Sequence, residues 1–361
     1  MYVALRDLRH ARGRFALIGT VVVLVAMLVT FLSSLTAGLA RASVSALTDL
    51  PADHLAFGAA APGDAPDLTS SRVTRDQWEA WAAEPGVLDA QPLGVATTRA
   101  TSGATTVAVT ALGVPPGSDL APGGGPDDGQ VVLTERGAEE LGLAAGDVLT
   151  LGGTDLTVDR VVADDAQLAH TPVAWASLAD WQAIGARGGS GDGPSATVVA
   201  LRTDEHADLA AADAATGTTT VTRDAARSAV SSFTAENLSL TTMQAFLVVI
   251  SALVVGAFFT VWTISRQGDV AVLKALGAST AAVVRDSVGQ AAVVLAVGVV
   301  GGVGIAALVG LAVGGTVPFV VSAATTLVPA ALLAVLGLAG AAVSLRPVLT
   351  ADPNSALGAA R

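Results

Sequence analysis

The sequence contains no cysteine and a single lysine, and each shortage excludes a class of function. Without cysteine the chain can form neither disulfide bonds nor thiolate metal sites. A P-loop nucleotide site requires glycine, lysine and then serine or threonine in succession. The one lysine, Lys274, stands between Leu273 and Ala275. The chain therefore cannot carry an ATP site of this kind.

Histidine is also scarce, and no pattern typical of an enzyme is present. The four histidines show no H-E-x-x-H spacing and fall in separate predicted segments. His54 beside Asp53 is better explained as a surface pair than as a catalytic one. The segment Gly188–Asp192 approaches a G-x-S-x-G elbow but lacks its last glycine. We expect no catalytic, metal or cofactor site in this chain, so it is predicted not to be an enzyme.

Charged residues are missing from three long stretches of the chain. These stretches are residues 15–40, 237–265 and 287–345. A helix needs about 20 apolar residues to cross a bilayer, and its backbone must satisfy its own hydrogen bonds in lipid. The third stretch is long enough for two such helices, and Gly314, Gly315 and Pro318 interrupt it near its middle. The sequence thus predicts four transmembrane helices, at roughly 15–38, 243–265, 287–313 and 321–345.

The first 40 residues allow two alternative readings. A cleavable signal peptide would end near Gly38-Leu39-Ala40, but the apolar stretch is longer than the roughly 7–15 residues of a signal core. We therefore expect a retained span. Residues 1–14 place Tyr2, Leu5 and Leu8 three apart with arginines between them, which predicts an interfacial helix. A plain basic flank of the first span would explain the same charges.

The charge distribution predicts the orientation of these helices. Residues 1–14, 266–286 and 346–361 together hold nine cationic side chains against four carboxylates, whereas residues 41–236 hold 10 arginines against 27 carboxylates. Basic short segments stay in the cytoplasm, while a long acidic domain can be translocated. We expect a multi-pass protein of the bacterial plasma membrane with both termini in the cytoplasm. The predicted parts are a cytoplasmic interfacial helix (1–14), transmembrane helix 1 (15–40), an extracytoplasmic α+β domain (41–236), transmembrane helix 2 (237–265), a cytoplasmic coupling segment (266–286), transmembrane helices 3 (287–313) and 4 (321–345), and a cytoplasmic tail (346–361).

The region 41–236 has the pattern of a folded α+β domain. Arg41–Leu50 is expected to continue the first span as a helical stalk that ends before Pro51. Alternation and β-branched residues predict strands at Gly94–Thr98, Thr105–Leu112, Gln130–Thr134, Val148–Leu151, Leu156–Val162 and Ala196–Leu201. Helices are predicted after Thr74, at Gly137–Leu143, Leu178–Ile184 and Ala207–Ala215, and from Asp224 toward the second span. The Gly/Pro-rich stretches Pro115–Gly129 and Gly185–Pro194 are predicted loops.

One face of the third predicted span consists of small residues spaced four apart. They are Gly298, Gly302, Ala306, Gly310 and Gly314. Such residues let a second helix approach closely, either within the chain or between subunits. The sequence does not choose between these two packing partners. No charged residue lies deep in any predicted span, which argues against a proton- or ion-coupled carrier.

The stretch Arg266–Ser279, between the second and third spans, has the pattern of a short amphipathic helix. Asp269 in its first turn and Lys274 near its last turn suit the helix dipole, and Gly277 is placed to end the helix in the left-handed conformation. The residues that share its apolar face are Val270, Leu273 and Leu276. So short a helix needs a surface to dock on. A docking element for a cytoplasmic partner and an ordinary inter-helix loop are the two interpretations.

The chain resembles a known family in its layout and in three motifs. One span, a large outer domain and then three spans are similar to the MacB/FtsX-type permease subunits of ABC transporters. The stretch Arg266–Ser279 resembles the family's "alLkalGas" segment, with Asp269 where the family usually has glutamate. The segment Gln130–Ala163, including Gly137–Leu143 and Gly146-Asp147-Val148, resembles the outer domain of the family, and Asp352-Pro353 resembles its C-terminal end.

The resemblance implies a permease that couples ATP hydrolysis by a separate ATPase to motion of its outer domain, for export or extracytoplasmic release of a substrate. It implies a homodimer, or a heterodimer with a similar permease, bound to two copies of the ATPase, with a cell-envelope partner and no nucleic acid. The residues expected to couple the ATPase are Asp269, Val270, Leu273, Lys274, Leu276 and Gly277. The alternative is a membrane-anchored sensor or scaffold, including a regulator of cell-wall hydrolases, whose acidic domain binds a partner without ATP.

Overall fold

The computed structural model describes residues 12–58, 65–184, 195–266, 268, 270, 272, 274, 276–313 and 317–344. The chain divides into two compact units, which we call the helical unit (Met1–Gly38 and Leu238–Arg361) and the α+β unit (Leu39–Asn237). Residues 1–11 of the predicted interfacial helix and the predicted C-terminal tail (346–361) lie outside the described residues. Residues 12–14 are described and form the start of the first long helix.

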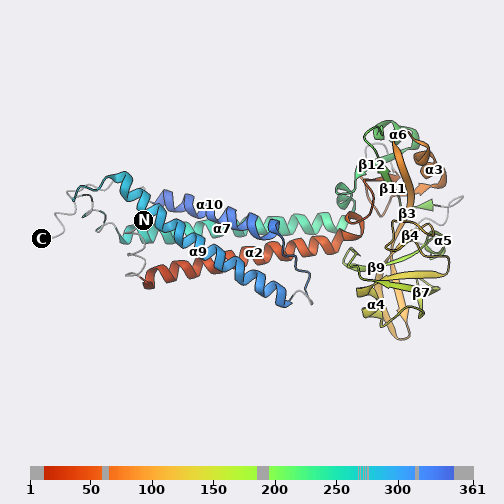
Figure 1. Ribbon diagram of the computed structural model, residues 1–361, viewed down its shortest axis with the longest axis horizontal. Coiled ribbons are helices and arrows are strands. Elements are labelled where there is room, and N and C mark those ends of the chain that lie inside the picture. The colour runs from red at the N-terminus through yellow and green to blue at the C-terminus, as the bar shows by residue number, and fades with distance from the viewer. Residues whose placement is uncertain are drawn as a thin grey trace. The chain divides into compact units, whose positions relative to one another are not determined.

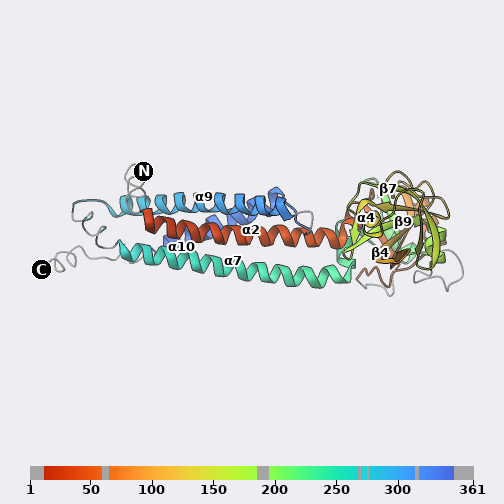
Figure 2. The ribbon, with the colours of Figure 1, turned by 90° about the horizontal axis from the view of Figure 1, so that it is seen from below.

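The helical unit consists of long apolar helices. They are α2 (Arg12–Thr48), α7 (Ser231–Ser265), α9 (Thr280–Val313) and α10 (Ala323–Ser344), and each is long and apolar enough to cross a membrane. They lie side by side in two perpendicular views (Figures 1 and 2). One apolar core joins all four helices, with Ile18, Val255, Val294 and Leu333 as members from each in turn. The predicted fold class, four apolar helices with an α+β domain between the first and the second, is confirmed.

Two of these helices extend beyond the helical unit. The last turns of α2 (Leu39–Thr48) and the first turns of α7 (Ser231–Asn237) belong to the α+β unit, and we call them the α2 stalk end and the α7 stalk end. The predicted helical continuation of the first span is confirmed, because α2 stops three residues before Pro51. Two unbroken helices therefore connect the units.

The α+β unit is organised around one long strand, β3 (Val87–Ser102), which is labelled near its centre in Figure 1. Its first half, Val87–Leu93, pairs with β11, and its second half, Gly94–Ser102, pairs with β4. The remaining strands are β1 (His54–Gly58), β2 (Val73–Thr74), β4 (Thr105–Val114), β5 (Gln130–Thr134), β6 (Val148–Leu151), β7 (Thr154–Val162), β8 (Gln167–Leu168), β9 (Thr171–Ser177), β10 (Ser195–Ala196), β11 (Val198–Thr203) and β12 (Thr218–Thr222). β3 thus takes part in two lobes.

In the first lobe, the sheet order β12-β1-β11-β3 is accompanied by two helices, α3 (Arg75–Ala83) and α6 (Leu209–Thr216). Trp78 and Trp81 of α3 are buried against Val199 and Leu201 of the sheet. We call this part the sheet lobe. The sequence predicted α3 and α6 but missed β1 and β12, which lack a clear apolar-polar alternation.

In the second lobe, strands β3-β4-β9-β5-β7-β6 form a closed ring, because β6 also pairs with β3. We call this part the barrel lobe. It carries α4 (Glu135–Leu141) and α5 (Leu178–Ala183). Gly94 and Gly113, which face each other across β3 and β4, leave space for the indole of Trp181, and a Cβ at Gly94 would lie within 2.7 Å of that ring. Closure of the ring leaves this lobe without an open sheet edge.

A third apolar core joins the α2 stalk end to both lobes. Val44 and Leu47 of α2 are buried with Phe57 of the sheet lobe and with Trp175 of the barrel lobe. A short 3-10 helix, η1 (Ala225–Ala229), precedes α7 and contributes Ala226 to the same core. All six predicted strands are present: β5 and β6 have the predicted bounds, β3, β4 and β7 are longer than predicted, and the strand predicted at Ala196–Leu201 is divided between β10 and β11. The loop predicted at 185–194 lies outside the described residues.

Candidate functional site

The part of the chain between α7 and α9 is helical at Gly268, Val270, Val272 and Lys274, and it leaves the helix from Leu276 on. The N–H of Val270 donates to the carbonyl of Arg266 at 3.0 Å, and that of Leu276 donates to the carbonyl of Val272 at 3.0 Å. Gly277 ends this turn with a φ of +96°, as predicted, in a region that favours glycine. The Ser279 hydroxyl then accepts the N–H of Ala282 and so caps α9. Asp269 and Leu273 lie outside the described residues.

The apolar residues of this segment face two directions. Val270 is 8% exposed and packs against Val283 of α9, so it is occupied within its own chain. Val272 is 58% exposed and Leu276 is 80% exposed, and these two residues are one helical turn apart. Lys274, between them in sequence, is half-buried. The structure therefore separates Val270 from Leu276, which the sequence had assigned to one face, and offers Val272 with Leu276 as the apolar surface.

A polar cluster holds together the two ends of the segment. The Arg266 guanidinium donates to Gln290 Oε1 at 2.6 Å, and the Gln290 amide donates to Asp286 Oδ2 at 2.9 Å. Gln290 is fully buried, and the guanidinium carbon of Arg266 lies 5.2 Å from the ring centroid of Trp262. We call this group the segment base. It joins the end of α7 to the first turns of α9, so a displacement of the segment would reach both helices.

Gln290 was not among the residues predicted from the sequence. The sequence pattern that could have indicated Gln290 is its position one helical turn after Asp286, at the start of an uncharged stretch. Its bond to Arg266 crosses 24 residues and could not be inferred from local spacing.

The small-residue stripe of α9 faces α2 and a residue near α10. A Cβ added at Gly298 would lie 2.6 Å from Val22, and one at Gly302 would lie 2.5 Å from the Val23 carbonyl oxygen. Ala306 is fully buried, and Gly310 lies against the ring of Phe319. Gly314 lies outside the described residues. The described part of the stripe thus contacts neighbours in the same chain.

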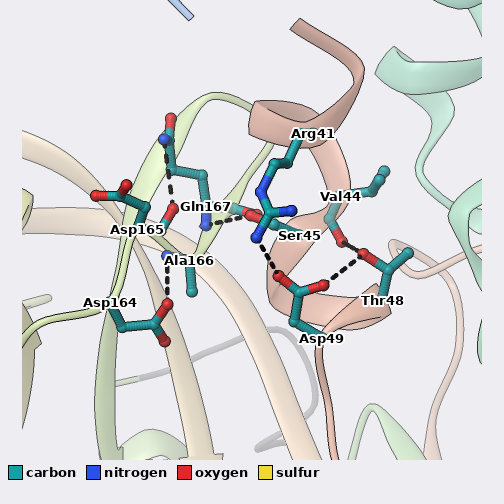
Figure 3. Close-up of polar contacts among 9 residues, drawn as sticks. All are labelled: Arg41, Val44, Ser45, Thr48, Asp49, Asp164, Asp165, Ala166 and Gln167. Carbon is teal, nitrogen blue, oxygen red and sulfur yellow. Dashed lines mark hydrogen bonds and ion pairs between the residues drawn. The ribbon is translucent and has the colours of Figure 1, made fainter. Parts of the chain in front are cut away.

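The α2 stalk end is bound to the segment that leads into β8 (Figure 3). The Ser45 hydroxyl accepts the N–H of Gln167 at 2.9 Å and donates to its carbonyl at 3.2 Å. Asp164 accepts the N–H of Ala166 and shapes the turn before it. Arg41 of α2 and Asp49, which follows the last residue of this helix, form an exposed ion pair at 2.9 Å. The contact between Ser45 and Gln167 joins residues 122 positions apart, and no local pattern in the sequence predicted it.

Comparison with known proteins gives matches over almost the whole chain. A family model described as a MacB-like periplasmic core domain matches residues 15–219, and one described as an FtsX-like permease C-terminal region matches residues 242–353. The first model alone covers more than half of the chain.

Curated relatives match end to end at low identity. A Staphylococcus epidermidis protein assigned by name to hemin transport, the permease HrtB, is 24% identical over 362 residues, with 99% of each chain covered. An uncharacterised ABC transporter permease of Mycobacterium tuberculosis is 28% identical over 367 residues, with 99% of each chain covered.

Two solved structures align with about half of this chain. The extracellular domain of the noncanonic ABC-type transporter YknZ from Gram-positive bacteria aligns at 13% identity and a TM-score of 0.35, covering 47% of this chain and 98% of that one. The periplasmic region of MacB from Actinobacillus actinomycetemcomitans aligns at 10% identity and a TM-score of 0.35, covering 50% of this chain and 93% of that one.

Proposed function

Because this chain belongs to the family of ABC transporter permeases with a MacB-like periplasmic core domain and an FtsX-like C-terminal region, we propose that it couples a separate ATPase to motion of its own α+β unit. The chain has no P-loop lysine, so the nucleotide site must lie on a partner. The helical unit lies in the bacterial plasma membrane, and the basic termini and the 266–286 segment lie in the cytoplasm.

The observation that carries this proposal is the exposed apolar pair Val272 and Leu276 on the segment between two spans. Paired apolar side chains at helical spacing are typical of a helix that docks in a groove of another protein. The segment base joins this pair to α7 and α9 through Gln290. Helix α7 is unbroken from Ser231 to Ser265, and its first turns belong to the α+β unit. A push on the segment therefore has a continuous helical path to that unit.

The assembly we propose contains two permease chains, either identical or this chain with a similar one, and two ATPase chains. Because Gly298 and Gly302 of the α9 stripe contact α2 of the same chain, this part of the stripe supports folding of the protomer rather than pairing of subunits. Cargo is exported or released on the outer side. Hemin, which the name of HrtB gives, is one candidate cargo, and the low identity assigns no residue to it.

The experiment is co-purification of the ATPase with Leu276→Asp. A carboxylate buried at an interface without a partner is costly, and loss of an interface anchor alone commonly costs roughly 2 kcal/mol or more. We expect the ATPase to be lost while the permease reaches the membrane at its normal amount. Ala281→Asp is the matched control, because Ala281 is also exposed and lies in the first turn of α9, where a carboxylate suits the helix dipole.

Retention of the ATPase by Leu276→Asp at the wild-type level would show that this segment is not the docking element. If the wild-type chain itself captures no ATPase, the chain is instead a scaffold or sensor that works without nucleotide.

A further inference from the structure

The turn between β8 and β9 has an unusual backbone. Ala169 and His170 have φ values of +49° and +64°, and they are the non-glycine residues with positive φ among those that the structure describes. Residues with a side chain adopt this conformation at an energetic cost, and such strain persists only where the surroundings impose it. Two such residues in succession indicate that contacts with the surrounding structure hold this turn in its position.

The α2 stalk end holds the turn through its backbone. The N–H of Ala169 donates to the Ser43 carbonyl at 3.0 Å, and the N–H of His170 donates to the Ala42 carbonyl at 3.1 Å. Leu168, which precedes the turn, is buried in the core that contains Val44 of α2. Together with the paired bonds of Ser45 shown in Figure 3, these contacts fix the turn to α2 at several points.

Among the described residues, the α7 stalk end hydrogen-bonds to the same turn through one side chain. His170 Nε2 lies 2.8 Å from Glu236 Oε2 of α7 and 2.9 Å from the Ser43 hydroxyl of α2. The Ser43 hydroxyl in turn lies 3.4 Å from the same Glu236 oxygen. We call this group of three residues the His170 latch. It joins α2, the turn and α7 at one point.

The latch has the residue types of a hydrolase triad but not its geometry. In a triad the acid and the serine bind opposite nitrogens of the imidazole, so that one side orients the ring while the other takes the proton. Here Glu236 and Ser43 both contact Nε2. The arrangement can tie elements together, and it cannot activate the serine.

We propose that the His170 latch is the releasable contact between the barrel lobe and α7, and that the lobe stays fixed to α2 when the latch opens. This inference rests on the proposed function, since it names the joint through which the two stalk ends act on the α+β unit. On the α2 side the turn has two backbone hydrogen bonds and the Ser45 pair, whereas its hydrogen bonding to α7 is the contact of His170 with Glu236. Leu168 shares its apolar core with both helices, through Val44 of α2 and Phe233 of α7. Because β9 pairs with β4 and β5, release of the turn from α7 changes the constraint on the whole barrel lobe.

The absence of native cysteine permits a direct test with paired cysteines. His170→Cys with Glu236→Cys reports the α7 contact, and His170→Cys with Ser43→Cys reports the α2 contact. Both pairs share one substituted position, so they control for its effect on folding. Each is cross-linked with a short bifunctional thiol reagent in the purified complex with its ATPase, without nucleotide and with ATP.

We expect both pairs to cross-link without nucleotide. With ATP, the yield of the α7 pair should fall at least fivefold, while the yield of the α2 pair stays within twofold. Hydrogen exchange of residues 167–171 in the unsubstituted complex gives a second measurement, and their exchange should rise with ATP. In a Glu236→Ala complex the exchange should already be high without ATP, and Glu236→Gln, which keeps an acceptor, should restore part of the protection.

If the complex binds and hydrolyses ATP but the two pairs respond alike, or neither responds, the latch is not the releasable contact and the proposed function still stands. If no ATPase associates with the chain, the proposed function and this inference fail together.

Discussion

The contact between α9 and α2 makes a quantitative prediction for Gly302→Ala. The added methyl group would lie 2.5 Å from the Val23 carbonyl oxygen, 2.6 Å from the Ala26 Cβ and 2.7 Å from the Met27 nitrogen. Favourable contacts between carbon atoms lie at about 3.5–4.0 Å, so the overlap is about 1 Å with each neighbour. Two of the three atoms belong to the backbone of α2 and cannot rotate away. The helices must therefore separate, and overpacking of this kind typically costs about 1–3 kcal/mol.

Gly304→Ala is the control for this variant. Gly304 lies on the same helix, is exposed, and has no atom within 4 Å of an added Cβ. Both substitutions gain the same intrinsic helix preference of alanine, about 1 kcal/mol, so their difference isolates the overlap. We expect Gly302→Ala to be less stable than Gly304→Ala by about 1–3 kcal/mol in denaturant titrations of the detergent-purified protein. Equal stability of the two variants would refute an intrachain packing role for this part of the stripe.

Three further predictions follow from the segment and from the charge pattern. A cysteine introduced at Ala210 should react with an impermeant thiol reagent in intact cells, whereas one at Ala281 should react only after the membrane is opened; labelling of Ala281 from outside would reverse the orientation. Gly277→Val forces a β-branched residue into a φ of +96° at a cost of about 1–2 kcal/mol. We expect this variant to bind the ATPase but to lose the ATP-driven motion. Gly268→Val, at a position where φ is not positive, should keep both the binding and the motion. Gln290→Leu removes two hydrogen bonds to charged groups and should lower the free energy of unfolding by about 2 kcal/mol in the same titrations; a change below about 0.5 kcal/mol would show that the segment base contributes little.

Features encoded over short stretches of sequence were predictable. The spans follow from long stretches without charge, because lipid leaves a helix few alternatives. The helix end at Gly277 follows from the one residue type that adopts a positive φ without strain. β5, a short stretch rich in β-branched residues, was found at its full length, and β7, which alternates, at nearly its full length.

Features that depend on contacts between distant residues were not predictable. Val270 and Leu276 are equivalent by spacing, and only the packing of Val283 against Val270 distinguishes them. The parallel pairing of β9 with β4 and the closure of the barrel lobe by β6 join strands that are far apart in the chain. His170 had no local signal, because its partners lie 127 residues before it and 66 residues after it.

The central claim is that nucleotide on a separate ATPase moves the α+β unit through α2 and α7. The most direct measurement is the distance between spin labels on Ala210→Cys in the sheet lobe and Ala281→Cys at the start of α9, in the otherwise cysteine-free chain. Both positions are exposed. In complex with the ATPase, the distance distribution should shift when ATP is added. The shift should be absent from the chain alone and from the Leu276→Asp variant. An unchanged distribution in a complex that hydrolyses ATP would contradict the account.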